Sequence, residues 1–296
     1  MFQENRIAFF DSGIGGLTTL FSCEQYLHAR LDVSRFPSFY YYGDNFRAPY
    51  GNLPNEKIFE YVDEAFSLFA CMNITVAVIA CNTATAVCID KLKEKYPFKI
   101  IGIEPAVISA AKNGGEVYVL ATTATCRSDR FKRLCERAEK QYPDCILKVI
   151  SCPQLAGEIE RNFGQKNYDF TKFFPEGNPA GVVLGCTHYS YLKKDFESFY
   201  RCPIYDGNEK VARKLYAILS KTSSNSLEDE KNERGDRYPN SRSLIDKKCF
   251  EKDGIIQTST NFCGFWDENP FATTQKTVFL GQAAGVNQTK YEQMFR

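Results

Sequence analysis

The sequence has few histidines, almost no net charge and no apolar run long enough for a membrane span. Only two of the 296 residues are histidine, which leaves little room for a histidine-rich metal site. Lys and Arg number 37 and Asp and Glu 36, and the formal charge of +1 argues against bulk electrostatic binding to nucleic acid or an acidic membrane. No apolar run approaches the ~18 to 20 residues that cross a bilayer. We therefore expect no metal, no nucleic-acid partner and no membrane partner.

The first residues also lack the pattern of a secretion signal. Residues 1–6 lead directly into the strand-like run 7–10, with neither a long apolar stretch nor a small-residue cleavage site. We therefore expect a cytoplasmic protein, in a reducing compartment where structural disulfides are rare.

Cysteine, by contrast, is abundant, with 12 residues. No two of them form a C-x-x-C pair, which argues against a zinc ribbon and against a thioredoxin-type redox motif. Free cysteine commonly serves as a small buried apolar side chain. We therefore expect most of the cysteines to be packing residues and only a few to carry chemistry.

Strand-like apolar runs alternate along the chain with helix-like segments. The strand-like runs are 7–10, 38–42, 76–80, 99–103, 116–120, 146–150 and 181–184. The helix-like segments are 56–72, 84–96, 128–142 and 208–219. Because continuous apolar runs are typical of parallel strands covered on both faces, this alternation predicts a doubly wound α/β architecture.

The two halves of the chain resemble each other weakly. Residues 78–83 and 183–188 are both an apolar strand followed by a small residue, a cysteine and a hydroxyl-bearing neighbour. We therefore expect two similar α/β domains, one of residues 1–105 plus 210–296 and the other of residues 106–209. Residues 221–253 are rich in mixed charge and poor in large apolar side chains, which predicts a mobile surface insertion.

The polar residues that follow the strands are the candidates for chemistry, because ligands of open α/β sheets bind at the carboxyl ends of the strands. These residues are Asp11, Ser12, Tyr50, Cys81, Asn82, Thr83, Thr122, Thr125, Cys186, Thr187 and His188. Helix N-termini in the same loops favour anions, and we expect them to lower the pKa of a thiol.

Two thiols on opposite sides of a bound substrate suggest inversion of a stereocentre without a redox cofactor. One cysteine removes a proton from carbon while the other delivers a proton to the opposite face. A competing interpretation is acyl transfer by a Cys186 nucleophile with His188 as base. These two residues are only two positions apart, whereas such pairs usually come from distant segments. Residues 11–16 could also be a dinucleotide loop, but they lack the G-x-G-x-x-G spacing.

Five blocks of sequence together resemble one known family, that of the glutamate racemases. The blocks are FDSGIGGL at 10–17, GD with RAPYG within 43–51, ACNTA at 80–84, GIEPA at 102–106 and LGCTHY at 184–189. The resemblance implies a cofactor-independent isomerase of two pseudo-symmetric α/β domains around an active-site cleft. Such an enzyme interconverts L- and D-glutamate and supplies D-glutamate for peptidoglycan, and a homodimer is expected.

The resemblance also assigns roles to residues. Cys81 and Cys186 match the two catalytic thiols, of which the first acts on D-glutamate and the second on L-glutamate. Asp11, His188 and Glu160 match the assisting catalytic groups. The matches to substrate contacts are Ser12, Pro49, Tyr50, Gly51, Asn82, Thr83, Thr122, Thr125 and Thr187.

Two departures from the family pattern lie beside these residues. Ala121 stands before Thr122 where the family has glycine, and Ser190 stands where it has proline. The alternatives that remain are an aspartate or related amino-acid racemase of the same superfamily and a binding or regulatory homologue without turnover.

Overall fold

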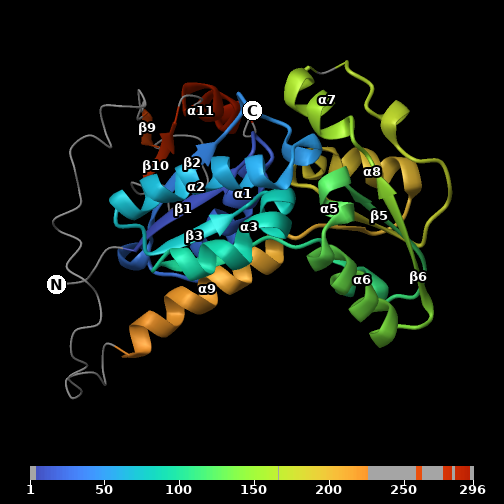
Figure 1. The fold of residues 1–296 in the computed structure, drawn as a ribbon, viewed down its shortest axis with the longest axis horizontal. Helices are drawn as coiled ribbons and strands as arrows, with labels where there is room; N and C mark the ends of the chain where they lie inside the picture. Colours follow the sequence, from blue (N-terminus) through green and yellow to red (C-terminus); the bar gives the residue numbers. More distant parts are fainter. Residues whose placement is uncertain (1–4, 166, 226–257, 262–275, 282–283, 294–296) are drawn as a thin grey trace.

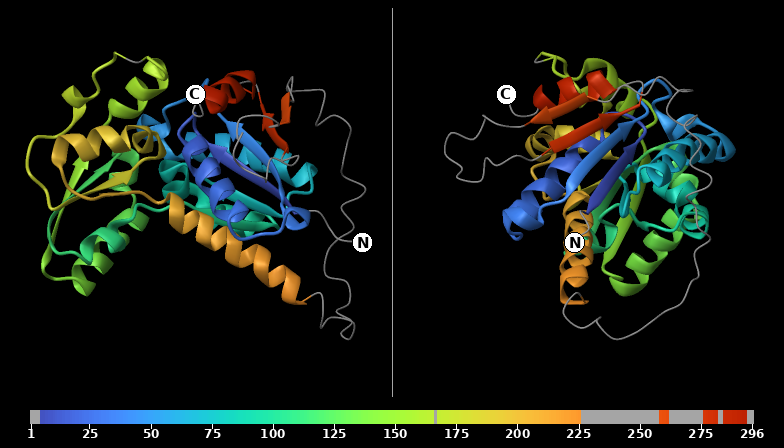
Figure 2. Two further views of the ribbon diagram at one scale, coloured as in Figure 1. Left: turned by 180° about the vertical axis from the view of Figure 1, so that it is seen from behind. Right: turned by 90° about the vertical axis from the view of Figure 1, so that its left-hand side faces the viewer.

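The chain forms two lobes, each built on its own β-sheet (Figure 1). The computed structural model describes residues 5–165, 167–225, 258–261, 276–281 and 284–293. Figure 2 shows the same two lobes from behind and from the side.

The first lobe contains a six-stranded sheet in the order β4-β3-β1-β2-β10-β9. All neighbours pair in parallel except β9, which runs antiparallel to β10. The strands are β1 (Arg6–Asp11), β2 (Ser38–Gly43), β3 (Val76–Ile79), β4 (Lys99–Gly102), β9 (Thr258–Asn261) and β10 (Lys276–Leu280). Their parallel order brings the carboxyl ends of β1 and β3 together at one edge of the sheet.

Helices cover both faces of this sheet because alternate strand residues point to opposite sides. Phe9 of β1 packs with α1 and α9, whereas its neighbour Phe10 packs with α2 and α3. These helices are α1 (Gly16–His28), α2 (Asn55–Cys71), α3 (Asn82–Lys95) and α9 (Asn208–Asn225). A further helix, α11 (Ala284–Gln293), lies beside β2 and β10.

The second lobe repeats this arrangement on a smaller scale, with four parallel strands in the order β6-β5-β7-β8. The strands are β5 (Gly115–Ala121), β6 (Cys145–Ser151), β7 (Gly181–Gly185) and β8 (Ile204–Tyr205). One face is covered by α4 (Val107–Ala111) and α6 (Asp129–Gln141), the other by α7 (Leu155–Asn162) and α8 (Lys193–Tyr200). The short helical elements are α5 (Thr123–Arg127) and the 3-10 turns η1 (Val33–Arg35), η2 (Tyr50–Asn52), η3 (Thr171–Phe173) and η4 (Thr187–Leu192).

The chain passes between the lobes twice, and both passages lie close together. The first follows β4 through Glu104, and the second precedes α9 at Gly207. A Cβ atom on Gly207 would lie 2.5 Å from the backbone oxygen of Glu104, so the two passages are in contact. The Glu104 carboxylate pairs with Arg130 of the second lobe at 2.7 Å and with Lys210 of α9 at 3.4 Å. Glu104 thus ties the two passages to both lobes.

The predicted doubly wound α/β architecture with two mainly parallel sheets is confirmed. The exact limits of the two domains stay a prediction. The segments named from the sequence do not include the helices α1, α4, α5, α7 and α8, the short strand β8 or the C-terminal elements β9, β10 and α11. The predicted insertion at 221–253 begins too early, because α9 continues to Asn225, and its remainder lies outside the described residues.

The aromatic cluster beneath α2 predicts where the first lobe is most sensitive to substitution. Phe66 is fully buried and its ring lies 5.4 to 6.5 Å from the rings of Phe10, Phe69, Tyr96 and Phe98. Phe66→Ala should therefore lower the free energy of unfolding by about 3 to 5 kcal/mol. The midpoint of urea denaturation, followed by circular dichroism, measures the loss.

The matched control is Phe46→Ala, since the Phe46 side chain is 70% exposed. It should change the free energy of unfolding by no more than about 0.5 kcal/mol. Equal effects of the two substitutions would contradict this description of the core.

Candidate active site

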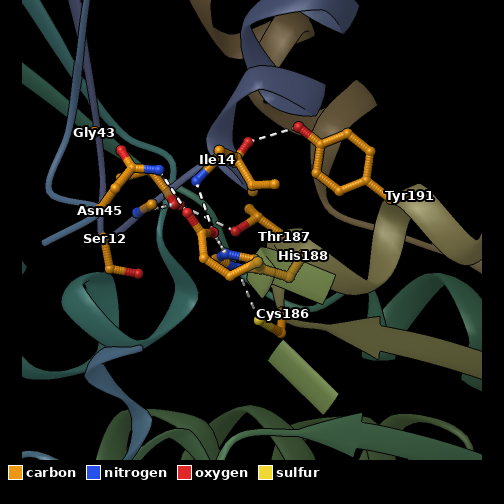
Figure 3. A network of polar contacts seen from close by, with 12 residues as sticks. Ser12, Ile14, Gly43, Asn45, Cys186, Thr187, His188 and Tyr191 are labelled. Carbon is orange, nitrogen blue, oxygen red and sulfur yellow. Dashed lines mark hydrogen bonds and ion pairs between the residues drawn. The ribbon is translucent and has the colours of Figure 1, made fainter. Parts of the chain in front are cut away.

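The carboxyl ends of strands from both lobes meet at one buried polar site (Figure 3). Asp11 ends β1 and Cys81 follows β3 in the first lobe, while Cys186 and His188 follow β7 in the second. All four side chains are buried, and Cys81 and Cys186 are only 5% and 7% exposed. The structure therefore places one thiol from each lobe in the same site.

Cys81 caps the N-terminus of α3. Its sulfur accepts a hydrogen bond from the Ala84 amide at 3.4 Å and lies 3.5 Å from the Ser12 hydroxyl. Burial and the nearby Asp11 carboxylate nevertheless raise the pKa of Cys81 to about 12. The expected lowering of the pKa is therefore wrong for this thiol, because the desolvation of a buried thiolate outweighs the helix terminus.

Cys186 has a different environment, in which a histidine is its partner. Its sulfur lies 3.8 Å from Nδ1 of His188, and Nε2 of that ring lies 2.7 Å from the Glu160 carboxylate. Burial lowers the pKa of His188, but the contacts with Cys186 and Glu160 outweigh it and the pKa is raised well above its usual value. His188 is therefore positively charged at neutral pH, and its Nδ1 side faces the Cys186 sulfur.

Asp11 links the two lobes beside Cys81. One carboxylate oxygen accepts from the Gly13 amide at 2.8 Å, and the other accepts from the Thr187 hydroxyl of the second lobe at 3.0 Å. Burial raises the pKa of Asp11, and the charge on His188 opposes this rise. Asp11 thus holds Thr187 in place and adds negative charge next to the Cys81 sulfur.

Glu160 of α7 accepts hydrogen bonds from three different segments. Its carboxylate accepts from the Ile14 amide at 3.1 Å, from the Asn45 side chain at 2.5 Å and from His188. The ammonium of Lys290 lies 3.8 Å from the same carboxylate. Burial raises the pKa of Glu160, but His188, Lys290 and the Ile14 amide outweigh it, so the pKa is lowered and the group is ionised.

A second set of contacts between the lobes consists of threonine hydroxyl groups. The Thr83 hydroxyl lies 2.9 Å from that of Thr122 and 3.3 Å from that of Thr125. Thr122 in turn donates to Thr125 at 3.0 Å. Gly51 lies against them, because a Cβ atom at this position would be 2.8 Å from Cβ of Thr122. The predicted residues Gly51, Thr83, Thr122 and Thr125 are therefore brought together.

Two of the predicted substrate contacts have other surroundings. The Tyr50 hydroxyl donates to Asp44 at 2.5 Å, and its ring lies in the same buried core cluster as Cys81. Pro49 is partly buried at the start of η2 and takes part in none of the polar contacts above.

Asn82 is buried, and its side-chain oxygen has no partner among the described residues. That oxygen is free to accept a hydrogen bond from a ligand.

The sequence analysis missed several residues that complete the site. Asn45 and Lys290 contact Glu160, while the hydroxyl groups of Tyr41 and Tyr191 donate at 2.7 Å to the backbone of Gly13 and of Ile14. Asn45 could have been predicted as a site residue, because it lies just beyond the end of β2. The sequence around Lys290, in the C-terminal segment, contains no pattern that points to the site.

A cavity of about 490 Å³ opens beside the threonine contacts. Asn52 and its neighbours in η2 form one wall, while Thr123 and Arg127 of α5 form the other.

Within the described parts of the chain, no group of three or more His, Cys, Asp or Glu side chains could hold a metal ion. Nor does any helix in those parts have the length and apolarity of a membrane span.

Comparison with known proteins identifies the family. The chain is 35% identical over 252 residues to glutamate racemase of Clostridium acetobutylicum, covering 77% of this chain and 94% of that protein. It is 32% identical over 233 residues to glutamate racemase 2 of Bacillus subtilis, covering 73% and 82%.

Solved structures show the same similarity. The Escherichia coli glutamate racemase, solved in complex with L-glutamate and the activator UDP-MurNAc-Ala, has a TM-score of 0.63 at 25% identity, covering 74% of this chain and 83% of that one. The Campylobacter jejuni glutamate racemase has a TM-score of 0.56 at 26% identity, covering 82% and 96%. The model of the family described as Asp/Glu/Hydantoin racemase matches residues 51–215, more than half of the chain. The resemblance drawn from the five sequence blocks is confirmed, and the chain belongs to the Asp/Glu/Hydantoin racemase family.

Proposed function

We propose that this protein interconverts L- and D-glutamate between its two lobes, with Cys81 and Cys186 as the two acid–base groups. The observation that carries the proposal is the pair of buried thiols, one at a strand end of each lobe, within a single polar site. The similarity to curated glutamate racemases supports glutamate as the substrate.

The chemistry requires two thiols in opposite protonation states. One thiolate takes the proton from Cα, the Cα–H bond breaks and its electron pair stays on Cα as a carbanion. The other thiol then gives its proton to the opposite face of Cα, so that the first sulfur ends protonated and the second ends as a thiolate. No electrons are gained or lost, and no cofactor takes part in these proton transfers.

The structure gives the two thiols unequal surroundings. Burial and the Asp11 carboxylate raise the pKa of Cys81 and favour its protonated form, whereas the charged imidazole of His188 lies beside the Cys186 sulfur. A protonated Cys81 can deliver a proton to Cα. By the family resemblance, Cys81 has this role when L-glutamate is converted.

The polar groups around the thiols fit an amino acid with two carboxylates. The free oxygen of Asn82 can accept from the ammonium group, and the hydroxyl groups of Ser12 and Thr83 can donate to the carboxylates. The Thr83 and Thr122 hydroxyl groups, which contact each other here, would exchange that contact for one with substrate. Arg127, in the wall of the adjacent cavity, offers a positive charge on the way in.

The setting we propose follows from the same activity. D-glutamate would supply peptidoglycan synthesis, the enzyme would act in the cytoplasm, and two copies of the chain would form a homodimer. Residues 1–105 with 210–296 and residues 106–209 are the proposed domains on either side of the substrate.

The two-thiol mechanism predicts loss of racemisation when either sulfur is replaced. Cys81→Ser and Cys186→Ser should each lower kcat by at least about 100-fold, because a serine hydroxyl is a far poorer acid–base group near neutral pH. Incubation with each glutamate enantiomer in D2O, without added pyridoxal phosphate, measures racemisation and exchange of the α-proton. Residual exchange should differ between enantiomers in the two variants.

The matched control is Cys71→Ser in α2, at a partly buried cysteine remote from the site, which should retain activity. Full activity of either catalytic-site variant would rule out the two-thiol mechanism. Exchange with aspartate but not glutamate would instead indicate an aspartate racemase. Exchange with neither amino acid would indicate a binding homologue, and both results would refute the proposed function.

The raised pKa of Cys81 predicts how its alkylation depends on pH. Because only the thiolate reacts, the rate of labelling by iodoacetamide should rise about tenfold per pH unit between pH 8 and 10. Peptide mass spectrometry of the substrate-free protein measures the rate at Cys81. A rate that levels off between about pH 9 and 10 would show that this thiol ionises with an ordinary pKa near ~8.5, and would contradict the environment described here.

A further inference from the structure

Helix α11 contacts both lobes through two side chains on one face. The Asn287 side chain donates to the backbone oxygen of Gly43 at 3.3 Å, at the end of β2 in the first lobe. The Lys290 ammonium donates to the backbone oxygen of Glu160 at 3.3 Å and lies 3.8 Å from the Glu160 carboxylate. Since residues three positions apart share a helix face, α11 joins the first lobe to α7 of the second.

The anchor of α11 on the first lobe is tightly packed. Asn287 is fully buried, and a Cβ atom on Gly43 would lie 2.7 Å from its side-chain nitrogen. The same Cβ atom would lie 3.0 Å from the side-chain oxygen of Asn45, which donates to Glu160 through its nitrogen. The segment after β2 and helix α11 therefore hold Glu160 from the same side.

Glu160 lies among groups of both charge signs. His188 of η4 and Lys290 of α11 are the two cations that lower its pKa. Burial is the largest cause of the raised pKa of Asp11 at the end of β1, of Tyr41 in β2 and of Tyr191 in η4, and the charge on Glu160 adds to each rise. The side chains of Lys290 and Glu160 are only 20% and 14% exposed, so water screens their attraction weakly.

We propose that Lys290 is a positioning residue for racemisation, which holds the Glu160 carboxylate against His188 so that the imidazolium stays directed at Cys186. This inference rests on the proposed function. Lys290 acts through Glu160, and its place on α11 means that the C-terminal segment contributes to the site. Without the ammonium group, α7 loses a link to the first lobe and Glu160 loses one of its two cations.

The pH dependence of the reaction follows from the charge on Glu160. Its pKa is lowered in the folded protein, so the carboxylate is present at neutral pH and is lost as the pH falls through that lowered value. Removal of the Lys290 charge would raise the pKa of Glu160. The acid limb of kcat/KM should then move to higher pH.

The experiment compares Lys290→Met with the conservative variant Lys290→Arg. Lys290→Met should lower kcat about tenfold, which corresponds to about 1.4 kcal/mol in the activation barrier, with KM changed less than about twofold. The acid limb of its kcat/KM profile should move to higher pH. Lys290→Arg should retain the kcat and the acid limb of the wild type. The control is Lys57→Met, which removes an exposed lysine from its ion pair with Glu60 on α2. It should leave kcat and the acid limb unchanged.

A double-variant cycle separates positioning from a general loss of stability. In a Glu160→Gln background, Lys290→Met should cause no further loss of kcat, because the group through which it acts is already gone. A further tenfold loss in that background would overturn the proposal. So would a Lys290→Met protein whose kcat and acid limb match those of Lys57→Met, or a Lys290→Arg protein as impaired as Lys290→Met.

A measurement without turnover distinguishes failure of this inference from failure of the proposed function. The chain has only two histidines, so His28→Asn assigns the imidazole proton signals of His188 by elimination. The proton on Nε2 of His188, which faces Glu160, should exchange with solvent at least about tenfold faster in Lys290→Met than in the wild type. Unchanged exchange would overturn the positioning role, whereas a wild type that fails to racemise glutamate would overturn the function alone.

Discussion

The whole site depends on how closely the turn after β1 approaches the second lobe. Two glycines of this turn leave no room for a side chain. A Cβ atom added to Gly13 would lie 2.6 Å from the Glu160 carboxylate, and one added to Gly15 would lie 2.5 Å from the Thr187 hydroxyl. Such distances are shorter than van der Waals contact, so a side chain at either position would force the lobes apart. The Ile14 amide would then no longer reach Glu160, and Asp11 would no longer reach Thr187. The two glycines are thus the steric condition for a site built from both lobes.

This close approach gives the two thiols unequal surroundings in an otherwise repeated architecture. Each follows a parallel strand of its own sheet, but Cys81 lies beside the Asp11 carboxylate and Cys186 beside the His188 imidazolium. A symmetric reaction needs two thiols that exchange roles, and it also needs them to differ in protonation at each instant. The fold supplies the symmetry through its two sheets. The charged residues at the strand ends make the surroundings of the two thiols different, with Glu160 helping to keep His188 charged.

The parts of this arrangement that depend on local sequence could be predicted. Continuous apolar runs indicated seven of the strands, and the rule that ligands bind at their carboxyl ends selected Asp11, Cys81, Cys186 and His188 before any contact was known. Burial at the lobe interface could not be predicted, and it reversed the expected direction of the Cys81 pKa. Lys290 was also out of reach, because nothing in residues 284–293 shows that this helix folds back onto β2. That contact depends on tertiary packing between segments over 240 positions apart.

The kind of contact between the lobes decides how a substrate could reach thiols that are almost fully covered. The buried residues of each of the four core clusters belong to a single lobe, and among the described residues only the partly buried Phe163 and Tyr191 of the second lobe pack against a first-lobe cluster. Between the lobes, the contacts described at the site are mainly hydrogen bonds, such as those of Thr83 with Thr122 and of Thr187 with Asp11. A hydrogen bond exchanged for water changes the free energy by only about 0.5 to 1.5 kcal/mol, far less than the exposure of an aromatic core. Exchange of these polar contacts for water would therefore cost far less than exposure of either core, so the lobes can part over the thiols while each keeps its own fold.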